Sequence, residues 1–276
     1  MVVKLMSVIN HQYKHRLKLK FGRFYFGIIM ALVTVFQVSA DTITYPNGAH
    51  VAIHLSYDDG LSSQLDHAIP TLDKYNIKAS FYLLPGSATL NNERQVEAWK
   101  KAAQNGHELG NHTVFHPCSS KGPDRSWVKP YASLEQRTPE WMAAEVKMAN
   151  TFLFLLDGQK SRTFTPPCFE TMTESGDYLS AVRPLVAGVY GRTLPKPEEV
   201  YWSAHNVSGR QLINYIKRSA ANPQTKIIGI KFHGVGGDYL SISNEAHREL
   251  VQYLAKHRDQ YWVTTYKNIV DYIHQQ

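Results

Sequence analysis

The sequence predicts an α/β fold built on a mainly parallel sheet, and three observations lead to it. From residue 41 onward, strand-like and helix-like runs alternate, as in parallel sheets joined by helical crossovers. About seven strand-like runs occur, which fits a closed or nearly closed barrel. The 276 residues suit one domain of barrel size plus a targeting segment.

The strand-like runs are short and apolar. In the first of them, large apolar residues alternate with smaller or polar ones from Val51 to Tyr57, and this period of two is typical of a strand. Six further runs follow along the chain. The predicted strands are residues 51–57, 79–84, 107–110, 162–165, 186–190, 227–232 and 262–265.

The helix-like runs lie between the strands, and the one that follows Thr138 is the clearest. Thr138 can cap it, Pro139 suits its first turn, and Gly158 can end it. Its apolar face is typical of a helix that packs on a core. The predicted helices are residues 62–75, 93–105, 139–156, 209–220, 244–257 and 267–274.

The N-terminus reads as a secretory signal peptide over residues 1–40. A basic region precedes an apolar run at 24–36, and Val38-Ser39-Ala40 offers the small residues of a cleavage site before Asp41. An uncleaved anchor is the alternative, but the run is shorter than the roughly 20 residues of a spanning helix. We therefore expect cleavage, no membrane span in the mature protein, and export to the periplasm or the medium, where disulfides form.

The charge of the chain is concentrated in that segment. The formal net charge is +7, and residues 1–40 hold six basic and no acidic residues. Subtracting six from seven leaves +1 for residues 41–276, the predicted mature domain. A nearly neutral domain gives no reason to expect nucleic acid as a partner.

Two groups of polar residues predict a metal site. Asp58 and Asp59 end the first strand before Gly60, and adjacent carboxylates repel each other unless a cation or a function keeps them there. A simple turn is the alternative. His112 and His116 stand four residues apart and can meet one metal from a helical turn or a tight loop. One carboxylate and two imidazoles leave positions for water and substrate, and the second aspartate is free to act as a base.

The order of these motifs resembles the polysaccharide deacetylases, which are carbohydrate esterase family 4 or the NodB-homology domain. The motifs are SYDDG, NHTVFH, a Pro-Pro loop and the IGIKFH run that ends in His233, and the resemblance covers about residues 49–272. It implies an irregular (β/α) barrel and a hydrolase that removes N- or O-linked acetyl groups from a polysaccharide or oligosaccharide. By this resemblance, Asp59, His112 and His116 bind one divalent metal ion, Asp58 is the base and His233 is the acid. We expect zinc, with cobalt, nickel or manganese as alternatives.

The third motif departs from the family pattern. Most members carry an arginine that orients the base, and here Thr165 stands in its place. Cys168 stands where a tyrosine is usual, and the Pro167–Cys168 loop can still offer a backbone donor to the oxyanion. Arg162 lies three residues from the expected position, so the residue that replaces the arginine is left open.

The fourth motif departs as well. Tyr201 precedes Trp202 where an aspartate usually orients the acid, so the partner of His233 is open, and Asp238 is near it in the sequence. We expect Tyr57 and Trp202 to line the substrate pocket. For Trp202, ordinary core packing is the alternative.

The two cysteines follow the predicted site. Cys118 comes two residues after His116, and Cys168 lies in the predicted oxyanion loop. If both loops lie over one barrel mouth, an oxidising compartment and an even count favour a disulfide. Two buried free thiols, or an extra sulfur ligand to the metal, are the alternatives.

The sequence leaves three alternative functions open. The favoured one is a metal-dependent deacetylase acting on an acetylated glycan. The second is a hydrolase of a small non-sugar amide on the same scaffold. The third is a non-catalytic carbohydrate-binding relative, which would be expected to lack Asp58 or a metal ligand, although all are present. The glycan and the oligomeric state are left open.

Overall fold

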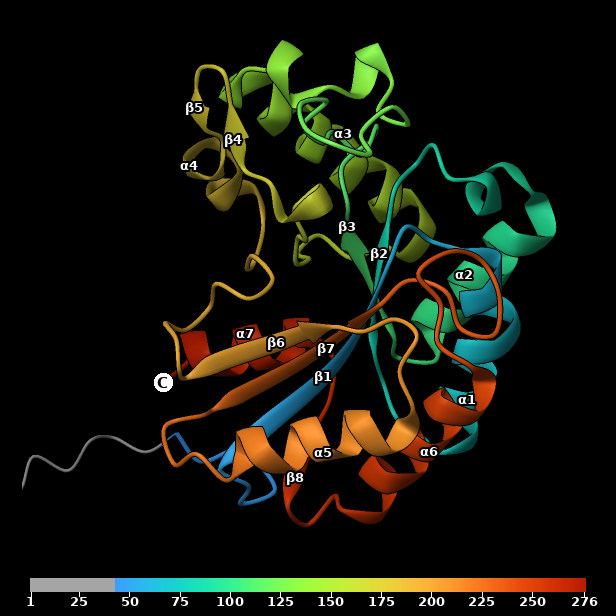
Figure 1. Ribbon diagram of the computed structural model, residues 1–276, viewed down its shortest axis with the longest axis vertical. Helices are drawn as coiled ribbons and strands as arrows, with labels where there is room; N and C mark the ends of the chain where they lie inside the picture. Colours follow the sequence, from blue (N-terminus) through green and yellow to red (C-terminus); the bar gives the residue numbers. More distant parts are fainter. Residues whose placement is uncertain (1–42) are drawn as a thin grey trace, which may run out of the picture. The chain divides into compact units, whose positions relative to one another are not determined.

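A six-stranded parallel sheet organises residues 43–276, which are the part of the chain that the computed structural model describes (Figure 1). Its strands run in the order β3-β2-β1-β7-β6, and β8 pairs with the first residues of β1. A separate antiparallel pair, β4 and β5, lies outside this sheet. The strands are β1 (Val51–Asp58), β2 (Ser80–Leu83), β3 (Glu108–Asn111), β4 (Met172–Thr173), β5 (Gly176–Asp177), β6 (Glu199–Ser203), β7 (Ile227–Phe232) and β8 (Tyr261–Val263).

The segments 162–165 and 186–190 form only isolated bridges. The prediction of regular strands in these two segments is therefore wrong. Phe164 bridges Asn111 at the end of β3, and Val189 bridges Phe164, both in parallel. The two segments thereby continue the parallel arrangement beyond β3. Pro166 and Pro167 have no backbone N–H to extend the ladder, which ends it at this point.

The predicted helices form with small shifts at their ends. The predicted helix at 62–75 starts at residue 62 as expected, but it contains a π-helical turn, Gln64–Ala68, which runs into α1. Thr138 caps α3 by accepting from the Trp141 amide, and Gly158 ends it with a φ of 71°. Figure 1 shows α3 beside β3, and α5 next to α6. The helices are α1 (Ile69–Lys74), α2 (Glu93–Gln104), α3 (Pro139–Asp157), α4 (Leu179–Val182), α5 (Gly209–Ala220), α6 (Asn244–Lys256) and α7 (Tyr266–His274).

The largest core cluster lies on one face of the sheet. Tyr57 of β1 stacks on Phe81 of β2 at 4.7 Å and packs against Phe232 of β7 at 5.3 Å, and all three are fully buried. Trp99 of α2 covers Phe81 from the same side. Burying such aromatic side chains is a main source of stability, and it fixes the positions of the three strands relative to one another.

The parallel register brings the carboxyl ends of the strands to one edge. Asp58 pairs with Tyr82, and Tyr57 pairs with Phe232, so β1, β2 and β7 end together. Leu83 pairs with Asn111, which places the end of β3 at the same edge. In barrels of parallel strands, this edge is where functional side chains gather.

The predicted signal segment, residues 1–40, lies outside the described residues. Within residues 43–276, none of the helices has the length and apolar character needed to span a bilayer.

Candidate active site

Asp59 and the two histidines of the second motif come together at this edge. Asp59 Oδ1 lies 3.2 Å from His112 Nε2 and 3.3 Å from His116 Nε2. One ligand atom from each of the three side chains lies within 4.8 Å of the others. Asp59 and His112 are buried, and His116 is partly exposed. The loops after β1 and β3 thus form one candidate metal centre.

A tight loop, and not a helical turn, presents the two histidines. Thr113 and His116 have positive φ angles of 67° and 53°. The Asn111 side chain accepts from the Thr113 amide, and the Thr113 hydroxyl accepts from the His116 amide. These bonds stabilise left-handed backbone that threonine and histidine rarely adopt, and they turn both imidazoles toward Asp59.

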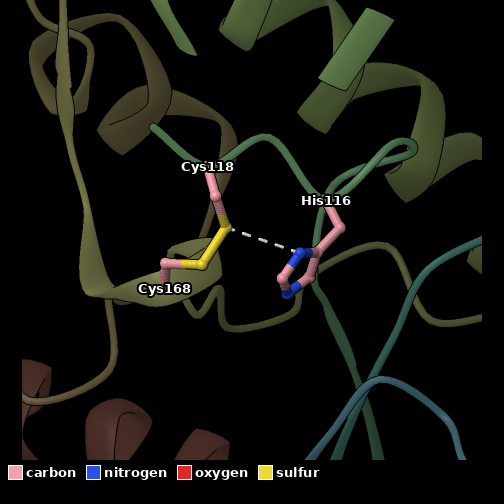
Figure 2. Close-up of side chains that lie close together, drawn as sticks. All are labelled: His116, Cys118 and Cys168. Atoms are coloured by element: carbon pink, nitrogen blue, oxygen red, sulfur yellow. Dashed lines mark hydrogen bonds between the residues drawn. A yellow bond between two sulfur atoms is a disulfide. The ribbon is translucent and has the colours of Figure 1, made fainter. Parts of the chain in front are cut away.

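Hydrogen bonds at the far nitrogens orient both imidazoles. His112 Nδ1 donates to the Thr165 carbonyl at 2.8 Å. His116 Nδ1 lies 3.6 Å from Cys118 Sγ, and because a disulfide sulfur carries no hydrogen, the imidazole is the donor (Figure 2). Both Nε2 atoms then carry the lone pair on the side of Asp59, as metal-binding histidines require.

The charges of the cluster perturb the pKa values of its members. Burial disfavours the charged form of Asp59, but the three neighbouring histidines outweigh it and lower its pKa. Burial also opposes a charge on His112, but Asp58 and Asp59 outweigh it and raise its pKa. For His116, burial and the neighbouring His112 lower the pKa to about 4.

The residues present fit a divalent cation. Asp59 Oδ1 is buried and has no hydrogen-bond partner, although it faces two imidazole nitrogens. Its other oxygen, Oδ2, accepts from the Tyr239 hydroxyl at 2.8 Å. Two imidazoles and one carboxylate are the donor set of open zinc sites.

Asp58 lies beside this cluster and pairs with a lysine. Its Oδ2 is 2.8 Å from Lys231 Nζ and 3.9 Å from His112 Nε2. Its Oδ1 is buried and has no hydrogen-bond partner. The Gln64 side chain donates to the backbone carbonyls of Asp58 and His233, which ties the ends of β1 and β7 together.

His233 faces the cluster from the end of β7. Its Nε2 lies 3.7 Å from Asp59 Oδ2, and burial lowers the pKa of the imidazole. Asp238, the alternative partner for His233, instead accepts from the Ser63 amide. His233 therefore lies at the cluster, and the structure gives no hydrogen bond between it and Asp238.

The disulfide between Cys118 and Cys168 is present in the structure, so neither cysteine is a free thiol or a thiolate ligand (Figure 2). It joins the loop after His116 to the short 3-10 turn Pro167–Phe169. Pro167 is buried, and Cys168 lines the same cavity as Asp59, His112 and His116. The predicted oxyanion loop thus lies at the site.

Two predicted pocket residues lie elsewhere, and both predictions need correction. Tyr57 belongs to the core face of β1, where its hydroxyl is 2.6 Å from His247 Nε2. Trp202 packs on Tyr215 at 5.3 Å, and its neighbour Ser203 lines the cavity. Side chains alternate between the two faces of a strand, so each aromatic points away from the cavity that its neighbour reaches.

Arg162 does not replace the missing arginine. It is buried and pairs with Asp157 at the end of α3, and it also donates to the Leu109 carbonyl. Thr165, which stands in the arginine position, has a buried hydroxyl without a hydrogen-bond partner.

Sequence reasoning missed Lys231 and Tyr239. A signal for Lys231 exists, because it is a lysine inside an otherwise apolar strand, two residues before His233 and on the same face. Tyr239 follows a glycine-rich loop, and no sequence pattern there indicates a role in the site. Its ring lies 6.0 Å from that of His233, and its contact with Asp59 depends on the loop conformation.

A cavity of about 890 Å³ opens over the cluster. Its floor contains the two aspartates and the three histidines, and large apolar or aromatic side chains form much of the rest. The latter are Leu61, Leu84, Trp127, Phe169, Tyr239 and Leu240. A cavity of this size, with polar groups gathered at its floor, is typical of a small-molecule or oligomer-binding site.

Comparisons with known proteins identify similar sequences and folds. The polysaccharide deacetylase family model matches residues 35–181, which is more than half of the chain. The chain is 44% identical over 57 residues to the uncharacterized protein YlxY of Bacillus subtilis, covering 21% of this chain and 17% of that protein. It is 37% identical over 70 residues to the peptidoglycan-N-acetylglucosamine deacetylase PgdA of Listeria monocytogenes, covering 25% of this chain and 14% of that protein.

Solved structures share the fold at low identity. A CE4 family pseudoenzyme from Bacillus anthracis superposes with a TM-score of 0.52 at 13% identity, over 80% of this chain and 66% of that chain. The Xyl-CE4 domain of a multidomain xylanase from the hindgut metagenome of Trinervitermes trinervoides superposes with a TM-score of 0.52 at 16% identity. The superposition covers 81% of this chain and 91% of that chain.

Proposed function

Since the chain belongs to the polysaccharide deacetylase family, we propose that residues 41–276 form a metal-dependent hydrolase domain that removes N- or O-linked acetyl groups from a polysaccharide or oligosaccharide. The observation that carries the proposal is the cluster of Asp59, His112 and His116 beside Asp58 on the floor of one cavity. A non-catalytic relative would be expected to lack one of these four residues.

Asp59 Oδ1 and the Nε2 atoms of His112 and His116 would hold the metal ion, which we propose to be zinc. When bound, such an ion polarises the acetyl carbonyl and makes water a better nucleophile. The Thr165 carbonyl and the disulfide keep the two imidazoles in the binding tautomer. The Tyr239 hydroxyl holds the second oxygen of Asp59.

Asp58 is the proposed base. Its Oδ2 is occupied by Lys231, which leaves the buried Oδ1 to accept a proton from the attacking water. His233 is the proposed acid, because it faces the cluster from the end of β7, the strand next to β1. In its protonated form, this imidazole would donate its proton to the leaving amine or alcohol oxygen. The backbone amide of Cys168 is the proposed donor to the oxyanion.

We also propose that residues 1–40 are a signal peptide and that the domain acts outside the cytoplasmic membrane on an acetylated glycan. The disulfide supports export, because such bonds persist in oxidising compartments. The family supports a glycan substrate.

An acetate-release assay tests this function. Purified protein, freed of metal and reloaded with zinc or cobalt, is given chitin oligosaccharides, peptidoglycan, acetylated xylan and small acetamides. We expect metal-dependent acetate release from at least one glycan. Release from small amides alone, or no release from any substrate with a full complement of metal, would refute the proposal.

A further inference from the structure

Lys231 is a buried lysine in the middle of a strand. It lies within β7, its side chain is 4% exposed, and its register partner on β1 is Ser56, which is on the same face as Asp58. A buried ammonium without a partner is strongly unfavourable, and the partner here is Asp58 Oδ2 at 2.8 Å.

We infer that Lys231 is a positioning residue for Asp58 and takes the role that the third-motif arginine has in most family members. This inference rests on the proposed function. The ion pair fixes Asp58 Oδ2, which lies 3.9 Å from His112 Nε2, and it leaves Oδ1 without a hydrogen-bond partner. The two other candidates for the role are excluded, because Arg162 pairs with Asp157 and Thr165 carries no charge.

An aromatic enclosure holds the ammonium in place. The centre of the Phe169 ring lies 3.6 Å from Lys231 Nζ, and that of Tyr190 lies 5.9 Å away. A cation at this distance from an aromatic ring is stabilised by the ring face. Phe169 in turn stacks on Tyr201 at 5.1 Å, with ring planes 7° apart.

The enclosure links three departures from the family pattern. Phe169 follows Cys168, which stands where a tyrosine is usual and is fixed by the disulfide to Cys118. Tyr201 stands where an aspartate is usual. We infer that the lysine, the disulfide and the Phe169–Tyr201 stack form one substitute for the missing arginine.

Kinetics of two variants at this position test the inference. In Lys231→Met, we expect kcat to fall about 10- to 100-fold, as when other partners just outside a metal centre are removed. KM and zinc stoichiometry should stay unchanged, and Lys231→Arg should recover part of the loss because it restores the cation. The control is Lys217→Met on α5. Like Lys231, Lys217 places its ammonium over an aromatic ring, 5.5 Å from the centre of the Tyr253 ring. Wild-type kcat in Lys231→Met, or equal losses in the arginine and methionine variants, would overturn the inference.

A double-mutant cycle measured by Tm tests the pairing of Lys231 with Asp58 without an activity assay. Lys231→Met leaves Asp58 buried and unpaired, so its Tm should fall. The double variant Asp58→Asn/Lys231→Met leaves no unpaired charge, so its Tm should fall less than the sum of the single shifts. Additive shifts would overturn the pairing. If the wild-type protein releases no acetate from any glycan, the proposed function fails, and the cycle still decides whether Lys231 holds Asp58.

Discussion

His116 Nδ1 donates a hydrogen bond to the Cys118 sulfur at 3.6 Å, so the disulfide directly contacts a proposed metal ligand. The bond presents Nε2 of the same ring to Asp59. The disulfide therefore has two separable effects: it crosslinks loops 50 residues apart, and it orients one proposed ligand.

Two paired replacements separate these effects. Cys118→Ser/Cys168→Ser and Cys118→Ala/Cys168→Ala both remove the crosslink, which stabilises by about 3 to 5 kcal/mol in the chain-entropy model. We expect similar losses of Tm in both. Only the alanine pair removes an acceptor for His116 Nδ1, so its zinc affinity should be about 10-fold weaker than that of the serine pair. Equal zinc affinity by titration calorimetry would show that the sulfur does not orient His116.

Removing the histidines should abolish metal binding. In His112→Ala/His116→Ala, two of three proposed ligands are lost, and we expect less than stoichiometric zinc after dialysis, measured by elemental analysis. His205→Ala, which removes an exposed histidine, is the control and should keep one zinc per chain. One tightly bound zinc in the double variant would place the metal elsewhere.

Tyr239→Phe should weaken zinc binding. The variant removes only the hydroxyl that donates to Asp59 Oδ2, and outer partners of this kind are worth about 10- to 100-fold in metal affinity or activity. Tyr131→Phe, at an exposed tyrosine, is the matched control. Competition with a chromophoric chelator measures the affinity, and identical values for the two variants would exclude a role for the hydroxyl.

Acid should destabilise the fold through His247. Burial lowers its pKa from 6.5 to about 3, so the imidazole is neutral in the folded protein, while the unfolded chain takes up a proton below about 6.5. Its stabilising contribution is thus complete above pH 6.5 and is lost as pH falls toward 3. In His247→Gln, the slope of the unfolding free energy between pH 6 and 4.5 should decrease by about 1.4 kcal/mol per pH unit. Urea titrations measure it, and an unchanged slope would show that His247 is not buried in its neutral form.

Much of the fold follows from local patterns that the sequence displays. The alternation from Val51 to Tyr57 and the Thr138–Pro139 cap predict β1 and α3 because each depends on neighbouring residues alone. The segments at 162–165 and 186–190 have strand-like composition, but long-range pairing decides whether a ladder forms. Here only Phe164 and Val189 find bridge partners. β6 was missed for the same reason, because its pairing with β7 is a tertiary interaction.

The site likewise contains residues that local motifs predict and residues that only tertiary contacts identify. Asp58, Asp59, His112 and His116 stand in motifs with specific spacing, and the structure brings them together. Lys231 acts on Asp58 across the sheet, a relationship that no short motif contains. Tyr57 and Trp202 were misplaced because nearness to a motif does not determine which face of a strand a side chain occupies.

The most direct test of the account is the rate of acetate release by zinc-loaded Asp58→Asn, on whichever glycan the wild-type protein deacetylates, with zinc content measured on the same samples. The variant keeps all three proposed ligands but loses the proposed base, so we predict full zinc content and a kcat lowered about 100- to 10,000-fold. Wild-type turnover by the variant at full zinc content would contradict the account.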